Sequence, residues 1–530
     1  MLRRESSEMK SHFDSRIDSG IRSGNSFDVE SRNLSPENTF GEDLVVQSRL
    51  CSLEDLADGE KKEFSIDIRG QDTVKVLLIK NKGKWYALGA HCTYCNSRLV
   101  DGILSFGKIR CSFHGTSFNI KNGKIEDPPG FDSLPFFTVK LSESEVYIST
   151  LVSKLMKTKI IDPMTKCKNQ ICDPTVIIGA GIAGITVAES LRQEGYGGRI
   201  VILSKEKTDP YNRSLLTKNI VSNPEELKFR DPEFYSKHDI ELLLGTKVKS
   251  INTDEKVVHL EDEKELNYSN LVLAMGSVNK SPSINGYPEL EGVFQLRNFN
   301  DLKTIKEETE KKHVTIVGTG YSALEITSLI SKSTRSVTIL GKSEMILRQF
   351  GPFFGRNLRA FIEDQGKVSI RQGSLIRSLG GYDRVSHLVL KDGLCAVANT
   401  VIVCTGTQPC TSILLGSKIQ TTPSGYVTVD ENMETNQHHV FAVGDLTEFP
   451  LTIFGGRRIS LQHVNVAQYQ AKIVARKITK RNFKNEFVPF FWIDLFEKHV
   501  TFCGDCSIVP EDFVVRGTLE TGDYRCYMFK

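Results

Sequence analysis

One glycine-rich stretch, Thr175–Gly184, constrains the fold of this chain more than any other feature. Four β-prone residues lead into three glycines in G-x-G-x-x-G spacing, Gly179, Gly181 and Gly184. The first glycine permits a tight turn, the second lets the backbone approach a pyrophosphate, and the third lets a helix pack against the strand. Ile185–Gln193 reads as that helix, and its N-terminus presents N–H groups to phosphates. Arg199–Leu203 predicts the next strand, after which Glu206 is placed to bind a ribose hydroxyl, so the stretch predicts a dinucleotide site.

A second unit of the same kind begins near residue 311. Val314–Val317 reads as a strand, a helix is expected from Leu324 to about Ser331, and Ser336–Leu340 reads as the following strand. Between the first strand and the helix lies a G-x-G-x-x-A loop, with Gly318, Gly320 and Ala323 at its fixed positions. From residue 174 onward strands and helices alternate, which indicates parallel sheets with crossover helices. Two such units predict an α/β protein that binds a flavin dinucleotide in one and a nicotinamide dinucleotide in the other.

Composition limits the class of protein and of partner. The chain has 530 residues, which predicts three or four domains. A net charge of +3 gives no indication of a nucleic-acid partner. The sequence has no run of about 18 apolar residues, so no membrane span is expected. The 12 cysteines are scattered through the chain, as in proteins of a reducing compartment. Acidic residues among the N-terminal arginines are unlike a transit peptide, so cytoplasm and mitochondrion both stay open.

Composition and strand patterns also divide the chain. Ser, Asn and charged residues dominate the first 43 positions and predict a disordered tail. Alternating apolar segments and Asn-Gly turns predict a small antiparallel β domain after it. The predicted division is a tail at 1–43, a β domain at 44–150, a linker at 151–172, a flavin-binding domain at 173–305 and 429–480, a nicotinamide-binding domain at 306–428, and a C-terminal α/β domain at 481–530.

Five short segments follow the first glycine loop in a distinctive order. They are Pro210–Lys218, Tyr268–Ser277, Gly406–Pro409, Val440–Asp445 and Pro489–Asp494. Together with the two loops they resemble the apoptosis-inducing factor and ferredoxin-reductase branch of the pyridine-nucleotide-dependent flavoprotein reductases, apart from Met275 in place of a threonine. The last segment resembles a turn at the flavin ring. The branch lacks a redox disulfide, and no Cys-x-x-Cys follows Gly184 here.

The resemblance implies an enzyme that oxidises NADH or NADPH through FAD. It places FAD on Gly179, Gly181, Gly184, Glu206, Arg213, Lys218, Gly276, Asp445 and Trp492. It places the nicotinamide nucleotide on Gly318, Gly320, Ala323 and Glu325. It further implies a catalytic ion pair of Lys218 with Glu325 beside the flavin. The acceptor stays open between an N-terminal metal centre, a soluble iron–sulfur protein and a quinone. A redox-sensing, pro-apoptotic binding protein with weak turnover is the alternative function.

The choice between NADH and NADPH rests on the end of the second strand of the nicotinamide unit. An NADH enzyme usually has an acidic residue there. Here the position is Gly341, followed by Lys342 and Ser343. Loss of the carboxylate removes repulsion of a 2′-phosphate, and Lys342 would attract it, whereas Glu344 would serve NADH. The sequence therefore leaves both nucleotides open.

The predicted β domain resembles a Rieske domain, which carries C-x-H and C-x-x-H boxes around a [2Fe–2S] cluster. Cys111–Gly115 is similar to the second box and includes His114, but the first box reads Cys92-Thr93-Tyr94. Sixteen residues, 95–110, separate the boxes, so the register of a Rieske domain is kept while Tyr94 replaces a histidine. Over residues 44–500 the chain resembles the Rieske-carrying members of the apoptosis-inducing factor family.

Three interpretations of these boxes compete. The favoured one is that the fold survives without its cluster, because a phenol is a poor replacement for imidazole on iron. In the second, His91 or Tyr94 completes a modified cluster. In the third, Cys92, Cys95, Cys111 and His114 form a Cys3His site for zinc or a single iron. A further Cys-x-x-Cys at 503–506 is interpreted as two partly buried thiols.

Overall fold

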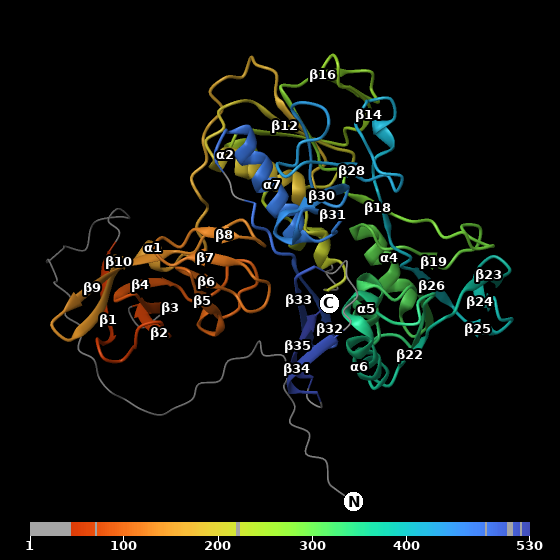
Figure 1. Ribbon diagram of the computed structural model, residues 1–530, viewed down its shortest axis with the longest axis horizontal. Helices are drawn as coiled ribbons and strands as arrows, with labels where there is room; N and C mark the ends of the chain where they lie inside the picture. Colours follow the sequence, from red (N-terminus) through yellow and green to blue (C-terminus); the bar gives the residue numbers. More distant parts are fainter. Residues whose placement is uncertain are drawn as a thin grey trace, which may run out of the picture. The chain divides into compact units, whose positions relative to one another are not determined.

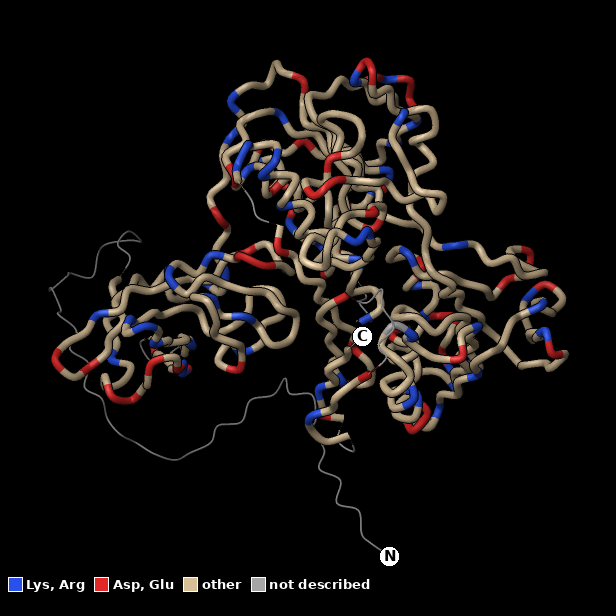
Figure 2. Tube along the Cα trace, in the orientation of Figure 1, with Lys and Arg blue, Asp and Glu red and all other residues tan. Residues whose placement is uncertain are grey.

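The computed structural model describes residues 44–68, 72–218, 223–482, 485–505, 512–519 and 522–529. The predicted tail at 1–43 lies outside these ranges. The elements given below belong to one compact unit that begins at Val45. Within the described residues, no helix has the length and apolar character needed to cross a membrane. Figure 2 shows basic and acidic residues interspersed along all of the described chain.

The N-terminal part consists of antiparallel strands (Figure 1). A six-stranded sheet has the order β1-β10-β9-β4-β3-β2 and a four-stranded sheet the order β5-β6-β7-β8. A two-residue turn with left-handed Lys82 and Gly83 joins β3 to β4, as the Asn-Lys-Gly-Lys sequence favours. The strands are β1 (Val45–Ser52), β2 (Lys61–Ile68), β3 (Asp72–Asn81), β4 (Lys84–Gly89), β5 (Ile103–Ser105), β6 (Lys108–Arg110), β7 (Ser117–Asn119), β8 (Ile125–Asp127), β9 (Phe136–Ser142) and β10 (Glu145–Leu151).

The first glycine loop follows β11, the central strand of a five-stranded parallel sheet of order β13-β12-β11-β17-β29. Every residue of β11 and β12 is buried, as expected for central strands covered on both faces. The strands are β11 (Thr175–Ile178), β12 (Ile200–Ser204), β13 (Ile240–Leu244), β17 (Asn270–Leu273) and β29 (Val440–Ala442), and α2 (Ile182–Gln193) packs against α7 (Val464–Ile478) (Figure 1). Helix α2 starts three residues before the predicted Ile185, because Gly181 is its N-cap.

The second loop belongs to another five-stranded parallel sheet, of order β19-β26-β20-β21-β22. Its strands are β19 (Val293–Phe294), β20 (His313–Val317), β21 (Ser336–Leu340), β22 (Val368–Arg371) and β26 (Thr400–Val403), and its helices are α4 (Phe299–Thr309), α5 (Tyr321–Ile330) and α6 (Gly351–Glu363). Helix α5 again starts earlier than predicted, at Tyr321 rather than Leu324, because Gly320 is its N-cap.

Short elements complete the two α/β parts. They are α1 (Val152–Leu155), α3 (Pro232–Lys237), β14 (Val248–Asn252), β15 (Val257–Leu260), β16 (Glu265–Asn267), β18 (Ser277–Asn279), β23 (Ile376–Gly381), β24 (Val385–Leu390), β25 (Cys395–Val397), β27 (Thr407–Pro409), β28 (Val427–Thr428), β30 (Thr447–Leu451) and β31 (Arg457–Ile459). The predicted linker at 151–172 begins with the last residue of β10 and then α1, and residues 156–172 contain no regular helix or named strand. The domain division proposed from the sequence stays a prediction.

The C-terminal part corrects two expectations. Its described residues form two antiparallel hairpins, β32 (Phe490–Leu495) with β33 (Lys498–Cys503) and β34 (Asp512–Thr518) with β35 (Asp523–Phe529), and no helix, so the predicted α/β piece is wrong there. Segment Pro489–Asp494, expected as a turn, is mostly strand β32. Its pairing with β33 places Phe491 opposite Phe502, and the two rings stack at a centroid distance of 4.8 Å. Cys506 lies outside the described residues, so the second Cys-x-x-Cys stays untested.

Candidate functional site

The first glycine loop has the shape of a phosphate cradle. A Cβ added to Gly179, whose φ is +115°, would lie 2.3 Å from the carbonyl oxygen of Ala274. One added to Gly184 would lie 2.0 Å from the carbonyl oxygen of Gly179. These two glycines therefore let backbone pack on backbone. An added Cβ at Gly181 would meet nothing within 4 Å, so this position faces open space above the start of α2.

The second loop repeats this geometry. A Cβ on Gly318 would lie 2.2 Å from the carbonyl oxygen of Cys404, and one on Gly320 would meet nothing within 4 Å. Ala323 is fully buried, as close packing of helix on strand requires. Neither Gly181 nor Gly320 caps its helix with a side chain, and the N-terminal end of each helix is the end that favours an anion.

One cavity of about 940 Å³ lies between the two dinucleotide-binding parts of the chain. Its volume is within the size range of cofactor sites. Most of the sequence-predicted residues line it, namely Gly179, Gly181, Glu206, Arg213, Lys218, Gly276, Glu325, Asp445 and Trp492. Gly184, Gly318, Gly320 and Ala323 do not line it, and the cavity reaches the start of α5 through Tyr321, Ser322 and Glu325. An open glycine cradle at one end and a carboxylate after β12 fit the pyrophosphate and ribose of FAD.

The carboxylate at the ribose end is held in place by arginine. Glu206 Oε1 accepts a hydrogen bond from Arg213 Nη2 at 2.6 Å, and Arg213 Nη1 donates to Tyr211 Oη at 2.9 Å and to the backbone oxygen of Arg297 at 3.1 Å. Arg297 also lines the cavity, where burial lowers its pKa although the nearby Asp445 favours the charged guanidinium. Sequence reasoning missed Arg297, since nothing in the chain spacing connects it to the glycine loop.

At the other end of the cavity Lys218 meets two carboxylates. Its Nζ lies 2.5 Å from Glu325 Oε1 and 3.0 Å from Asp494 Oδ2, and Thr217 Oγ1 also donates to Glu325. Burial favours the neutral amine, but Glu325 and Asp494 outweigh it and raise the pKa of Lys218, which therefore stays cationic. The pKa of Asp494 falls to about 2 despite burial, because His499 and Lys218 stabilise the carboxylate. The structure thus brings together Lys218 of the flavin part and Glu325 of helix α5.

Helix α7 adds a residue that sequence reasoning missed. His463 lies at its N-cap and lines the cavity, where Nδ1 accepts from the backbone N–H of Asn465 at 3.2 Å. Burial lowers the pKa of His463 to about 3, with a further contribution from Lys218, so its ring is neutral. Trp492, buried on β32, packs edge-on against this ring at a centroid distance of 4.5 Å. A histidine directly before a long helix is the sequence signal that would have indicated the position.

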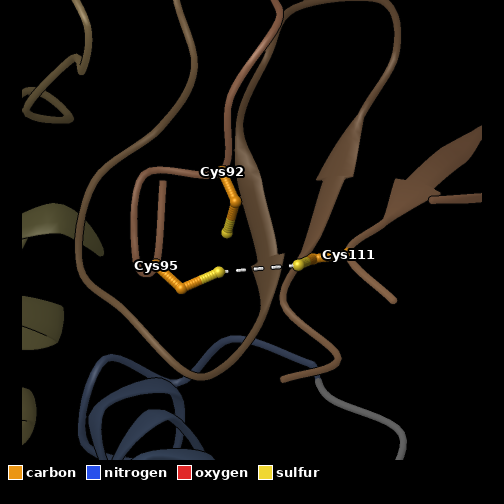
Figure 3. A group of neighbouring side chains, drawn as sticks. All are labelled: Cys92, Cys95 and Cys111. Atoms are coloured by element: carbon orange, nitrogen blue, oxygen red, sulfur yellow. Dashed lines mark hydrogen bonds between the residues drawn. The ribbon is translucent and has the colours of Figure 1, made fainter. Parts of the chain in front are cut away.

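The Rieske-like boxes bring three thiols together. Figure 3 shows Cys92, Cys95 and Cys111 pointing toward one another, with Sγ of Cys95 and Cys111 3.7 Å apart. The Tyr94 ring packs edge-on against that of His114 at a centroid distance of 5.2 Å, and its hydroxyl is directed toward the side chains of Ser214 and Asn212. The residues present therefore do not fit the two-cysteine, two-histidine ligand set of a Rieske cluster.

The same boxes approach the flavin cavity. The His114 ring lies 4.6 Å from that of Trp492, and the Tyr94 ring lies 6.2 Å from it. His499 on β33 contacts the backbone oxygen of Phe113 through Nε2 at 2.7 Å, and Asp494 through Nδ1 at 2.6 Å. The β domain thus packs against the residues that flank Lys218.

A nearly buried charge network joins the β domain to the flavin part. Arg230 makes four contacts of 2.7–3.2 Å to Asp132 of the β domain and to Glu189 on α2. Nearby, the side-chain amide group of Gln468 on α7 donates to and accepts from the backbone of Gly130. These contacts hold the β domain in a defined position at the cavity.

The residues at the end of β21 bear on nucleotide choice. A Cβ on Gly341 would lie 2.3 Å from Thr319 Cγ2, so a larger residue there would require the Thr319 side chain to move. Lys342 is exposed. Glu344 lies beside Gly373, where an added Cβ would be 2.6 Å from its Oε1. The charged side chains that follow this strand are therefore Lys342 and Glu344, while Gly341 itself contributes none.

Comparison with known families agrees with this geometry. Residues 173–471 match the family described as pyridine nucleotide-disulphide oxidoreductase, and residues 47–138 match the Rieske [2Fe-2S] domain. The chain is 31% identical over 500 residues to human (Homo sapiens) apoptosis-inducing factor 3, covering 93% of this chain and 82% of that protein.

Bacterial reductases resemble its flavoprotein part. The ferredoxin–NAD(+) reductase subunit of the Pseudomonas putida benzene 1,2-dioxygenase system is 31% identical over 351 residues, 65% of this chain and 84% of its own. Among solved structures, the ferredoxin reductase for the CYP199A2 system of Rhodopseudomonas palustris superposes with a TM-score of 0.64 at 27% identity, over 68% of this chain and 89% of its own.

Proposed function

This chain belongs to the pyridine nucleotide-disulphide oxidoreductase family, and we propose roles for the individual residues of its cavity on that basis. It is an NAD(P)H-dependent flavoprotein oxidoreductase that carries a Rieske domain, as in apoptosis-inducing factor 3. FAD, when bound, accepts a hydride from NAD(P)H and passes the electrons on. The observation that carries the proposal is the contact of Lys218 with Glu325, since it joins the flavin part to the nicotinamide part inside one cavity.

The glycine loops bind and orient the two nucleotides. Gly181 and Gly320 leave room for the pyrophosphates at the N-terminal ends of α2 and α5, which favour negative charge. Glu206, fixed by Arg213, accepts a ribose hydroxyl. At the middle of the cavity Asp445, which accepts a hydrogen bond from Ser277 at 2.8 Å, binds a hydroxyl of the flavin chain.

Lys218 and Glu325 act at the reacting end. Lys218 remains cationic and stabilises negative charge that develops next to it during hydride transfer. Glu325, on the first turns of α5, holds the lysine by its carboxylate and so sets the position of the charge. Neutral His463 and buried Trp492 keep water from this end of the cavity.

The electron acceptor we propose is a soluble redox protein of the ferredoxin type. Similar proteins bear the names ferredoxin–NAD(+) reductase and rubredoxin–NAD(+) reductase. The Rieske-like boxes lack one of the four cluster ligands, which favours a separate carrier over the attached domain. Turnover with a plant-type ferredoxin or a rubredoxin supports this assignment. Reduction of the artificial acceptor ferricyanide, with neither protein reduced, would contradict it.

Replacement of the lysine tests the catalytic proposal. Lys218→Ala is expected to slow flavin reduction by NADH and NADPH about 100-fold, as removal of one preorganised charge does in other enzymes. Lys249→Ala, which removes an exposed lysine paired with Glu263, is the control and should keep the parent rate. Rapid mixing under anaerobic conditions measures the rate, and absorbance confirms that each variant carries FAD. A fully loaded Lys218→Ala protein that reacts at the parent rate would remove Lys218 from the mechanism.

A further inference from the structure

The three thiols of the Rieske-like boxes converge on one point. Ligand atoms of Cys92, Cys95 and Cys111 all lie within 4.8 Å of one another, and the Cys95 and Cys111 sulfurs are 3.7 Å apart. Cys92 and Cys95 belong to the loop after β4, whereas Cys111 directly follows β6. Two separate loops thus bring their sulfurs to a common centre (Figure 3).

A histidine lies beside the group. His114 lies three residues after Cys111 and interacts with the side chain of Cys95, and its ligand atom also forms a second close group with Asp494 and His499. Its Nδ1 is buried and has no hydrogen-bond partner, which is costly for an imidazole nitrogen unless another group binds it. His91, in contrast, belongs to neither group, and its backbone pairs with Arg98 in an isolated bridge. The interpretations that use His91 or Tyr94 as ligands therefore lose their geometric support.

We propose that Cys92, Cys95, Cys111 and His114 bind a single thiolate-seeking metal ion, Zn²⁺ or Fe²⁺, in place of a Rieske cluster. Metal–sulfur bonds of about 2.3 Å in a tetrahedron separate the sulfurs by about 3.8 Å, close to the 3.7 Å observed. A Rieske cluster instead needs two histidines on its outer iron, and Tyr94 is turned toward Asn212 and Ser214. Binding the ion displaces the thiol protons and no electron is transferred.

The ion would fix the face of the β domain that touches the flavin cavity. His114 contacts Trp492, and the neighbouring Phe113 contacts His499, so a bound ion holds both loops against β32 and β33. Zinc in this place has a structural role, whereas a single iron would also be redox-active. The inference does not depend on the proposed function, because a metal site can be present or absent whatever the rate of hydride transfer.

Metal and sulfide analysis of the full chain tests the inference. We expect about one zinc or one iron per chain and no acid-labile sulfide, after purification or after anaerobic reconstitution with Zn²⁺ or Fe²⁺. Zinc and iron are distinguished by elemental analysis and by the thiolate-to-iron absorption. Two irons with two sulfides per chain would overturn the proposal, and so would a reduced protein that retains neither ion.

Matched variants locate the ligands. Cys95→Ser should lose at least about 10-fold in affinity for Zn²⁺, while Tyr94→Phe and Cys503→Ser should bind it like the parent. Cys503 is exposed and belongs to the other Cys-x-x-Cys sequence. Circular dichroism confirms that each variant is folded. Unchanged affinity in a folded Cys95→Ser protein would overturn the Cys3His assignment, as would loss of metal in Tyr94→Phe.

Discussion

Replacement of Arg230 by methionine is the substitution whose effect on the free energy of unfolding can best be worked out from the structure. The arginine side chain is 6% exposed, and its partners Asp132 and Glu189 are 9% and 1% exposed. Methionine keeps the aliphatic bulk and removes the charge. Asp132 retains the ammonium of Lys159 at 3.5 Å, so the main cost falls on Glu189, which is left buried without its ion pair.

Removing one partner of a buried ion pair usually costs 3–5 kcal/mol, and the remaining lysine places this case near the lower limit, about 3 kcal/mol. The matched control is Arg199→Met. Arg199 holds Glu241 with two contacts of 2.5 and 2.8 Å, but both side chains are at least one third exposed. Exposed pairs contribute about 0–1 kcal/mol, so the control should be nearly neutral.

The loss of stability caused by Arg230→Met should also depend on pH. Burial raises the pKa of Glu189 even with Arg230 beside it, and loss of the arginine raises this pKa further. A carboxyl group whose pKa is higher in the folded state binds a proton on folding, so its stability contribution falls as pH rises from the unfolded pKa to the folded one. The difference in free energy of unfolding between Arg230→Met and parent should therefore be smaller at about pH 5 than at about pH 8.

Urea unfolding, followed by circular dichroism and by release of flavin fluorescence, measures these differences. Equal stability of Arg230→Met and Arg199→Met at about pH 8 would refute the reasoning, because it would mean that burial of the network has no energetic consequence. A difference that grows as pH falls would refute the assignment of the cost to Glu189.

Two further predictions concern the nucleotide loops. Gly181→Val should weaken FAD binding at least about 10-fold with little loss of apoprotein stability, since its side chain enters only the open cradle. Gly184→Ala should instead destabilise the fold, because its Cβ would lie 2.0 Å from the carbonyl oxygen of Gly179. Equilibrium dialysis measures FAD affinity and urea unfolding measures stability, and the opposite pattern would refute the assignment of the loop as a phosphate cradle. Lys342→Glu should raise KM for NADPH relative to NADH about tenfold, as reversal of one charge near a 2′-phosphate would; equal changes in steady-state KM would exclude that contact.

Local patterns were enough to predict the parts of the site that depend on backbone shape. The spacing of Gly179, Gly181 and Gly184 requires a turn, a close approach and a helix start within ten residues, so the loop follows from the sequence. The starts of α2 and α5 were predicted too late, because the three residues after each N-cap glycine, the third loop position included, are already helical. The C-terminal α/β prediction failed because β34 and β35 are mostly exposed and carry little periodic signal.

Long-range partners could not be predicted from local patterns. The pairing of Lys218 with Glu325 was expected only through resemblance to a family, and the participation of Asp494 was not expected at all. Arg297 and His463 were missed because they lie far from the first glycine loop in the sequence and come to the same cavity only in the folded protein. The orientation of Tyr94 toward Asn212 depends on contact between two domains, and this contact is invisible in the spacing of the Rieske-like boxes.

The most direct test of the account is hydride transfer to the bound flavin. FAD-loaded parent protein is mixed anaerobically with NADH or NADPH, unlabelled or carrying deuterium at the transferred position, and the absorbance of the oxidised flavin is followed. We expect one equivalent of at least one nucleotide to bleach one FAD, more slowly when the transferred hydrogen is deuterium. A protein that binds FAD and is bleached by neither nucleotide would contradict the account.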